Sequence, residues 1–358
     1  MTETAVRDLQ DQVASAANQD RALHIQGGGT KTDRLPAVEG NKLDTGGLQG
    51  IIEYAPSELV VTARAGMPLK ALQARLNENG QMLGFEPPAY GEAATVGGTV
   101  ACGLSGPRRA YAGALRDFVL GVRCLNGRGE DLRFGGQVMK NVAGYDIARL
   151  MAGAQGTLGV LLEVSFKVLP LPASERTYCQ TMSVEEALTH MNALAARPLP
   201  LSAAAWFDGT LFIRCSGSQA AVEAAGRELR MATADGGADF WRRLCEQQLA
   251  FFDSRSPVWR LSLASTASQP AVDGNWLIDW GGAQRWLCTD APAATVQSAA
   301  AEAGGYATLL RNDGQGDFDQ GALPELPAPL RRLHQRVKQA FDPVGIFNPG
   351  LLYTEAAC

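Results

Sequence analysis

The sequence predicts an α+β protein built from two domains. Short apolar runs typical of strands alternate with stretches in which apolar residues recur at helical spacing. The chain has 358 residues, of which 46% are hydrophobic, and this is enough for two substantial cores. The composition changes beyond Pro172. We therefore expect one domain over residues 1–172, a smaller α+β domain over 173–325, and a C-terminal segment over 326–358.

The first elements follow from the spacing of apolar residues. Those between positions 6 and 17 predict an opening helix. The apolar run 22–25 predicts the first strand, and 59–63 predicts another. A helix over 68–80 has proline at its first position and glycine at its end, which are the residues favoured there.

A glycine-rich loop, Gln26–Lys31, follows the first strand. Three successive glycines can adopt positive φ and present backbone N–H groups to an anion, with Thr30 and Lys31 beside them. A flexible surface turn is the alternative interpretation. The order Thr30-Lys31 excludes a Walker A loop, and the absence of helical periodicity after Lys31 excludes a Rossmann fingerprint.

A second glycine-rich region spans residues 84–113, with few periodic apolar positions. Long loops of this kind inside a compact domain are usually functional, and we expect this one to wrap a ligand. Strands follow at 119–125 and 130–134. A further glycine cluster at 153–159 leads into the alternating pattern of 160–168, which predicts a half-buried strand.

The second domain mixes helices and strands. Its patterns predict helices around 187–194 and 222–229, with a hairpin over 203–215 between them that turns at Asp208-Gly209. Further strands are expected at 258–263, 276–280 and 285–289. A last helix, over 330–341, is expected in the C-terminal segment.

Composition excludes several classes of function. The net charge is −5 without a long basic run, so nucleic-acid binding is not expected. No stretch is as apolar as a membrane span, and the polar, acidic N-terminus does not resemble a signal peptide. The seven scattered cysteines lack a CxxC motif and indicate reduced thiols in the cytoplasm. Because the three histidines are far apart in sequence, we expect no metal site.

Five motifs carry a resemblance to the vanillyl-alcohol-oxidase/PCMH-type FAD-binding family. They occur in the order in which that family has them. The resemblance implies a PCMH-type FAD-binding domain of two α/β subdomains with a smaller α+β cap, and a C-terminal segment that returns to the FAD domain. The motifs are Gly27–Thr30; Thr95–Gly98; Arg109 and Tyr111–Gly113 before 116–122; Gly153 with Gly156–Val160; and Phe347–Gly350.

The resemblance also implies how FAD is held. The first glycine loop binds the pyrophosphate, the middle loop follows the flavin, the fourth motif meets the adenine end, and Asn348 reaches the flavin edge. No histidine or cysteine stands where the family forms a covalent link, so FAD is expected to be noncovalent. The expected FAD-binding residues are Gln26, Gly27, Gly28, Gly29, Thr30, Lys31, Pro88, Thr95, Val96, Gly97, Gly98, Ser105, Gly106, Arg109, Tyr111, Gly113, Gly153, Gly156, Thr157, Gly159, Val160 and Asn348.

Two stretches, Lys140–Asp146 and Asp279–Trp286, are similar to the smaller FAD-binding subunits of bacterial glycolate oxidases. That similarity implies oxidation of glycolate or D-lactate to the 2-oxo acid. It also implies two partners, a larger FAD-binding subunit and an iron–sulfur subunit, and a cytoplasmic complex that meets the inner membrane. A self-sufficient FAD oxidoreductase acting on another alcohol or sugar and a noncatalytic FAD-holding subunit are the alternatives.

Oxidation of a hydroxy acid needs a cation for the carboxylate and a base for the hydroxyl group. Arg214 and Arg260 are the candidate catalytic residues, because arginine binds carboxylates in a bidentate manner and both lie on expected strands. A structural ion pair or a solvated strand face is the alternative for each. The second domain has only His190, so the histidine–metal cluster of larger relatives is absent.

Overall fold

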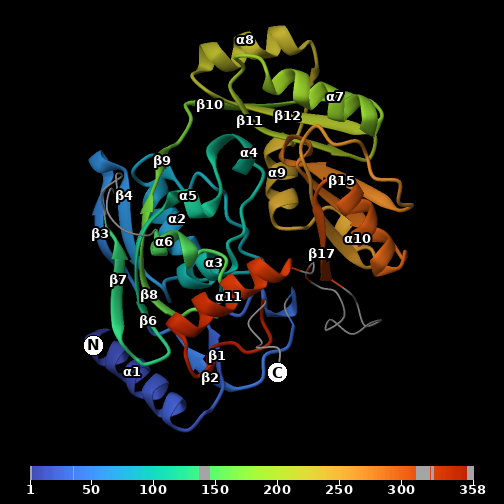
Figure 1. The fold of residues 1–358 in the computed structure, drawn as a ribbon. Helices are drawn as coiled ribbons and strands as arrows, with labels where there is room; N and C mark the ends of the chain where they lie inside the picture. Colours follow the sequence, from blue (N-terminus) through green and yellow to red (C-terminus); the bar gives the residue numbers. More distant parts are fainter. Residues whose placement is uncertain (1, 35, 137–145, 312–322, 324–325, 353–358) are drawn as a thin grey trace. The chain divides into compact units, whose positions relative to one another are not determined.

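The computed structural model describes residues 2–34, 36–136, 146–311, 323 and 326–352. They belong to two units, and Figure 1 labels their helices and strands where there is room. The first unit comprises residues 1–104, 114–171 and 326–358, and the second comprises 105–113 and 172–325. Lys140 to Tyr145, in one of the two stretches that resemble glycolate oxidase subunits, lie outside the described residues.

An antiparallel five-stranded sheet forms the core of the first unit, in the order β3-β4-β8-β6-β7. The central strand β8 is buried from Val160 to Phe166, so it is not the half-buried strand that its alternation predicted. Its polar residues are covered because Ser165 shares a 2.8 Å hydrogen bond with Thr62, and Glu163 meets Arg123 at 2.7 Å. The strands are β3 (Ile51–Ala55), β4 (Val60–Arg64), β6 (Val119–Leu125), β7 (Asp131–Gly135) and β8 (Val160–Lys167).

A separate small layer carries the glycine loop. Strand β1 (Leu23–Gln26) pairs in parallel with β2 (Asn41–Asp44), and Phe347 bridges to Leu23. Strand β1 is therefore flanked by β2 on one side and by the segment around Phe347 on the other, and the glycine loop begins where β1 ends. The other elements of this unit are α1 (Thr2–Asn18), α2 (Leu69–Asn77), α3 (Val96–Cys102), α5 (Leu115–Phe118), α6 (Ile147–Leu150), α11 (Ala328–Phe341), the β5–β9 pair (Gln81–Met82, Leu169–Pro170) and the 3₁₀ turns Thr32–Arg34 and Pro56–Glu58.

The glycine-rich region 84–113 contains a helix that the sequence pattern did not reveal. Helix α3 begins after Thr95, whose side chain accepts a hydrogen bond from the Gly98 amide, and it ends at Gly103 with φ of 65°. Its glycines give it low intrinsic propensity. Packing nevertheless requires glycine at position 97, because a Cβ there would come within 2.7 Å of the Ala65 Cβ atom.

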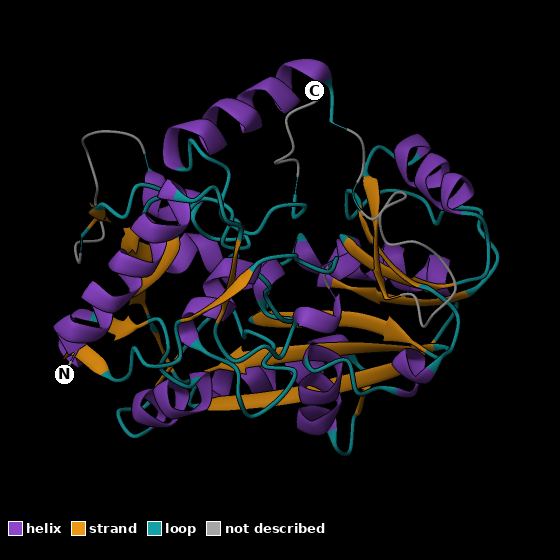
Figure 2. Cartoon of the chain, turned by 90° about the horizontal axis from the view of Figure 1, so that it is seen from below, coloured by secondary structure: helices purple, strands orange, loops and turns teal. Residues whose placement is uncertain are grey.

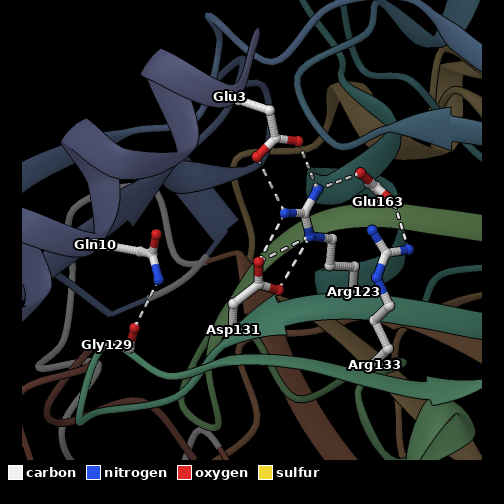
Figure 3. Close-up of polar contacts among 7 residues, drawn as sticks. All are labelled: Glu3, Gln10, Arg123, Gly129, Asp131, Arg133 and Glu163. Atoms are coloured by element: carbon white, nitrogen blue, oxygen red, sulfur yellow. Dashed lines mark hydrogen bonds and ion pairs between the residues drawn. The ribbon is translucent and has the colours of Figure 1, made fainter.

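A charged network ties α1 to the sheet (Figure 3). Arg123 on β6 is 8% exposed and binds Asp131 at 2.7 Å, Glu163 at 2.7 Å and Glu3 at 3.3 Å. Arg133 reaches the second oxygen of Glu163 at 3.1 Å. The hydrogen bond and the charge of Arg123 hold the pKa of Glu3 below its usual value.

Replacing Arg123 with methionine is expected to lower the free energy of unfolding by about 3 kcal/mol, because the buried Glu163 carboxylate loses its buried ion-pair partner and keeps its ion pair with the exposed Arg133. Glu3 adds a pH signature: a carboxyl group with a lowered folded pKa stabilises above its unfolded pKa and loses that stabilisation as the pH falls through its folded pKa. The variant should therefore show a weaker acid dependence of stability. Urea unfolding at neutral and acid pH measures both effects, and an unchanged midpoint would mean that the network contributes nothing.

The second unit is built on one eight-stranded antiparallel sheet, in the order β13-β10-β12-β11-β15-β16-β14-β17; Figure 2 shows strands in orange and helices in purple. Helices α7 and α8 pack on one face around Ala204 and Ile213, and α9 packs on the other around Ala203 and Trp286. The hairpin turns at Asp208 and Gly209 as expected, both with positive φ. The elements are α4 (Arg109–Ala112), β10 (Ser174–Thr181), α7 (Val184–Ala195), β11 (Leu201–Phe207), β12 (Thr210–Gly217), α8 (Gln219–Leu229), β13 (Ala232–Thr233), α9 (Gly237–Cys245), β14 (Val258–Ser262), β15 (Asn275–Asp279), β16 (Gln284–Cys288), α10 (Ala293–Glu302), β17 (Tyr306–Arg311) and the 3₁₀ turns Ala250–Asp253 and Trp280–Gly282.

Candidate functional site

A pocket of about 320 Å³ lies in the first unit, at the end of β1. The glycine loop, helix α3, Gln155 and the C-terminal segment form its walls. Of the residues expected to bind FAD, nine line it: Gln26, Gly27, Gly28, Gly29, Thr30, Lys31, Thr95, Gly98 and Asn348. The other lining residues are His24, Ile25, Thr32, Pro36, Ala37, Val38, Ala101, Cys102, Gln155 and Leu351.

The loop glycines pack tightly against the chain that precedes α3. A Cβ at Gly27 would overlap the Thr95 hydroxyl group, and one at Gly28 would overlap the Ala93 carbonyl oxygen. Gly29 has φ of 69°, a conformation that side chains disfavour. The first two glycines therefore allow close packing within the chain, and their role in letting the backbone approach a ligand stays a prediction.

The amides of Gly28, Gly29 and Thr30 make no hydrogen bond to any described residue. The Thr30 hydroxyl group instead donates to the Ala89 carbonyl at 2.7 Å, and the Lys31 ammonium donates to the same carbonyl at 3.2 Å. Unsatisfied consecutive amides beside a pocket form an anion-binding concavity. This arrangement fits a pyrophosphate.

Helix α3 presents Gly98 to the pocket. Beyond the backbone of α3 itself, the one described atom that an added Cβ there would meet within 4 Å is the Thr95 hydroxyl oxygen, at 3.1 Å. The amides at the start of the helix are used within the protein, because Val96 donates to Met67, Gly97 to Ala65, and Gly98 to Thr95. The loop, and not a helix N-terminus, therefore supplies the free donors.

Asn348 joins two walls of the pocket through its side chain. Its Oδ1 atom accepts from the Ile25 amide at 2.8 Å, and its Nδ2 atom donates to the Gln155 carbonyl at 2.6 Å. A Cβ at Gly156 would lie 2.7 Å from that Nδ2 atom, which explains glycine at this position. Asn348 is 3% exposed, and its side-chain oxygen and nitrogen each make a hydrogen bond to the protein backbone.

The electrostatic character of the pocket suits an anion. Its described lining includes Lys31 and His24 and contains no aspartate or glutamate. Burial raises the pKa of the Cys102 thiol, which keeps this pocket residue neutral at physiological pH.

Other expected FAD-binding residues support the pocket without lining it. Val96 and Gly97 pack on Met67 and Ala65, and Pro88 is buried before the Ala89 carbonyl. The fourth motif, which includes Gly153, Gly156, Thr157, Gly159 and Val160, leads into β8, and Gly153 donates to the Val100 carbonyl at 2.9 Å. A direct role of these residues at the adenine end stays a prediction.

Five expected FAD-binding residues, Ser105, Gly106, Arg109, Tyr111 and Gly113, belong to the second unit. There Trp280 holds their loop: its indole nitrogen donates to the Gly106 carbonyl at 3.0 Å, and the Arg109 guanidinium lies 4.2 Å from its ring centroid. Trp280 has φ of 53°, which is rare for a large side chain, and its amide donates to Asp279 at 2.7 Å. The role of this loop at the flavin stays a prediction.

Arg214 is engaged within the second unit. Its guanidinium is buried, donates to the Ser202 hydroxyl oxygen at 3.1 Å and lies 3.8 Å from Glu175. Burial alone would raise the pKa of Glu175, but Arg214, Ser216 and Arg108 together lower it. This geometry favours the structural ion pair over a substrate contact for Arg214. Arg260 is partly buried on β14, in register with Trp286 and Thr308, and its proposed catalytic role stays a prediction.

Sequence reasoning missed several lining residues. His24 was not among the expected site residues, although its place two residues before the glycine loop could have indicated the pocket. Gln155 lies inside the fourth motif and has φ of 51°, which no sequence pattern reveals. For Val38 and Leu351, the sequence indicates a place in the pocket only through their closeness to a motif.

Neither a metal cluster nor a membrane span emerges from the described chain. No group of three histidine, cysteine, aspartate or glutamate residues in it is arranged to hold a metal ion. Likewise, none of its helices has the length and apolar character needed to cross a bilayer.

Comparisons with known proteins identify the family of the chain and the class of its fold. A family model described as an FAD binding domain matches residues 3–135. The chain is 47% identical over 347 residues to glycolate oxidase subunit GlcE of Escherichia coli strain K12, which covers 97% of each chain. It is 31% identical over 127 residues to glycolate oxidase subunit GlcD of Bacillus subtilis strain 168, but this covers only 36% of the chain and 27% of GlcD.

A solved structure of alkyldihydroxyacetonephosphate synthase matches with a TM-score of 0.65 over 96% of this chain and 74% of that chain, at 13% identity. The α+β, PCMH-type fold expected from the sequence is thereby confirmed, and the first unit carries an FAD-binding domain of that type. At a finer level, the chain belongs to the family of the glycolate oxidase subunit GlcE.

FAD in this pocket is expected to protect Cys102 from alkylation. Only free protein can react, so FAD at a hundredfold excess over its Kd should slow labelling by up to about 100-fold. Cys179 and Cys245, which are also partly exposed but belong to the second unit, serve as internal controls. Peptide mass spectrometry after maleimide treatment measures all three rates. Labelling of Cys102 at the same measurable rate with and without FAD would place the cofactor elsewhere.

Proposed function

We propose that this chain is the FAD-binding subunit of a glycolate oxidase complex. In this complex glycolate or D-lactate is oxidised to the 2-oxo acid, and electrons pass by way of flavin to partner subunits. The observation that carries the proposal is 47% identity to GlcE over 97% of both chains. The cofactor is FAD, held noncovalently, since the FAD binding domain spans residues 3–135.

Each part of the pocket has a proposed role in binding FAD. The free amides of Gly28–Thr30 would hold the pyrophosphate, with the positive charge of Lys31 nearby. Gly98 leaves space for the bound molecule, and Asn348 fixes the wall between Ile25 and Gln155. When bound, FAD supplies an acceptor for hydride or electrons.

The second unit provides little for the oxidation itself. Its single histidine, His190, lies on α7, and the Arg214 guanidinium is held by Ser202 and Glu175. A base for the hydroxyl group is needed in any such oxidation. We therefore propose that a larger FAD-binding subunit oxidises the hydroxy acid and that the flavin of this chain relays electrons.

The proposed partners are the larger FAD-binding subunit and an iron–sulfur subunit. The similarity to GlcD covers about a third of this chain, which fits a partner that is related to it over part of its length. The complex is proposed to be cytoplasmic and to meet the inner membrane through its partners.

Anaerobic reduction tests this division of labour. The chain is purified alone and with its two partners, and glycolate or D-lactate is added while the visible flavin absorbance is followed. We expect flavin in the isolated chain to stay oxidised and to bleach in the complex. Bleaching in the isolated chain would instead identify a self-sufficient enzyme. Full turnover by a complex whose small subunit lacks FAD would indicate an assembly role.

A further inference from the structure

An ion pair lies buried where helix α11 ends. Lys338 and Asp342 are 6% and 2% exposed, and the Lys338 Nζ atom is 2.7 Å from the Asp342 Oδ2 atom. Within α11, Lys338 is the single residue classed as buried. Burying two charges is costly unless their remaining hydrogen-bonding capacity is satisfied. Because α11 buries no other residue, packing of this helix does not explain why the ion pair is buried.

The pair uses its hydrogen bonds to hold the following turn. Asp342 accepts from the amides of Gly345 and Ile346 at 3.1 Å each and of Phe347 at 2.8 Å. Lys338 donates to the Phe347 carbonyl at 2.9 Å as well as to the carboxylate. The backbone from 345 to 347 is thus fixed at four points by two side chains.

Lys338 also reaches the fourth glycine motif. Its third hydrogen bond goes to the Thr157 carbonyl at 2.8 Å, two residues after Gln155. Burial lowers the pKa of the Lys338 ammonium, and the charge and hydrogen bond of Asp342 oppose that effect. Removing one partner would therefore leave the other without its compensating charge.

The fixed turn leads directly to the pocket. Ile346 accepts from the Leu23 amide at 2.7 Å, and the Asn348 amide donates back to the Leu23 carbonyl at 3.0 Å, so this segment is aligned along β1. The Asn348 side chain then holds Ile25 and Gln155, and the Gln155 amide donates to Ala101 on α3 at 2.8 Å. Ile25, Ala101, Gln155 and Asn348 all line the pocket.

We propose that Lys338 and Asp342 are positioning residues for the FAD site, acting through Asn348. They hold the 345–347 turn in the register in which the Asn348 side chain bonds both β1 and Gln155. Gln155 in turn bonds Ala101 on α3. The inference rests on the proposed binding of FAD in this pocket. Loss of the pair is therefore expected to weaken FAD binding, whereas an equally destabilising change elsewhere in the first unit should leave FAD binding nearly unchanged.

The test is an FAD titration of the full-length apoprotein. In Lys338→Met the methylene stem is kept and the charge is lost. If the competent arrangement of Asn348 falls to about a tenth of the population, the apparent Kd for FAD rises about tenfold. The matched control is Arg123→Met, which removes a buried cation from the same unit without touching a pocket residue. The control should lower the thermal midpoint of the apoprotein and leave the Kd for FAD within about twofold of wild type.

A double-mutant cycle shows whether Lys338 acts through Asn348. Asn348→Ala should weaken FAD binding by itself, and adding Lys338→Met should weaken it little further, because the two share one path. If Lys338→Met fails to fold, Lys338→Met/Asp342→Asn removes both charges and takes its place in the cycle. Fully additive losses, or a wild-type Kd in a folded Lys338 variant, would overturn the inference.

The cycle also separates this inference from the proposed function. Wild-type chain that retains no FAD would contradict FAD binding itself. A second outcome is that the wild-type chain binds FAD and that affinity falls in Asn348→Ala but not in the Lys338 variants. This outcome would contradict only the positioning role.

Discussion

Replacing Gly98 with leucine is expected to abolish FAD retention while the chain stays folded. Gly98 lines the pocket, and beyond the backbone of α3 itself the one described atom within 4 Å of an added Cβ there is the Thr95 hydroxyl oxygen. The leucine side chain would therefore extend into the space that the cofactor needs. We expect the Kd for FAD to rise at least about 100-fold, or about 3 kcal/mol. Gly98→Ala should give a smaller loss, so the two variants form a graded series.

Two other glycines determine how this result is interpreted. Gly47 has no atom within 4 Å of an added Cβ and does not line the pocket, so Gly47→Leu is the matched control and should retain FAD. Gly28 is unsuitable, because any side chain there overlaps the Ala93 carbonyl and would disturb folding as well as binding. Circular dichroism and visible absorbance of the purified variants measure fold and flavin. A Gly98→Leu protein with a full complement of FAD would place the cofactor outside this pocket.

FAD is expected to raise the thermal midpoint of the first unit by about 5–10 °C. A ligand at a hundredfold excess over its Kd stabilises the state that binds it by about 2.7 kcal/mol, and each kcal/mol shifts a unit of this size by a few degrees. The pocket residues all belong to the first unit, so melting of the second unit should respond less.

Calorimetry of the apoprotein with increasing FAD measures this shift. The Gly98→Leu chain provides the control and should show no change at the same FAD concentration. A shift of equal size in that variant would mean that FAD stabilises the protein through another site.

The glycine loop and its strand could be predicted from sequence because both depend on local residue order. An apolar run followed by three glycines, a threonine and a lysine limits the backbone to a turn rich in free amides. The physical reason for Gly27 and Gly28 could not be predicted. It lies in the close approach of Thr95 and Ala93, which are more than sixty residues away in the chain.

Long-range contacts likewise set the features that sequence reasoning missed. Helix α3 forms despite its two glycines because Ala65, Met67 and Thr95 satisfy its first amides. Gln155 becomes a pocket residue through a positive φ and bonds to Ala101 and Asn348. Asn348 itself was expected at the site only by family resemblance, since nothing local distinguishes it from any other asparagine before proline.

The most direct test of the FAD site is a crystal structure of the chain reconstituted with FAD. We expect pyrophosphate oxygens within about 3.2 Å of at least two of the amides of Gly28, Gly29 and Thr30. We also expect the Asn348 side chain to keep its hydrogen bonds to Ile25 and Gln155. A pyrophosphate bound away from this loop, with these amides still unpaired, would contradict the proposed site.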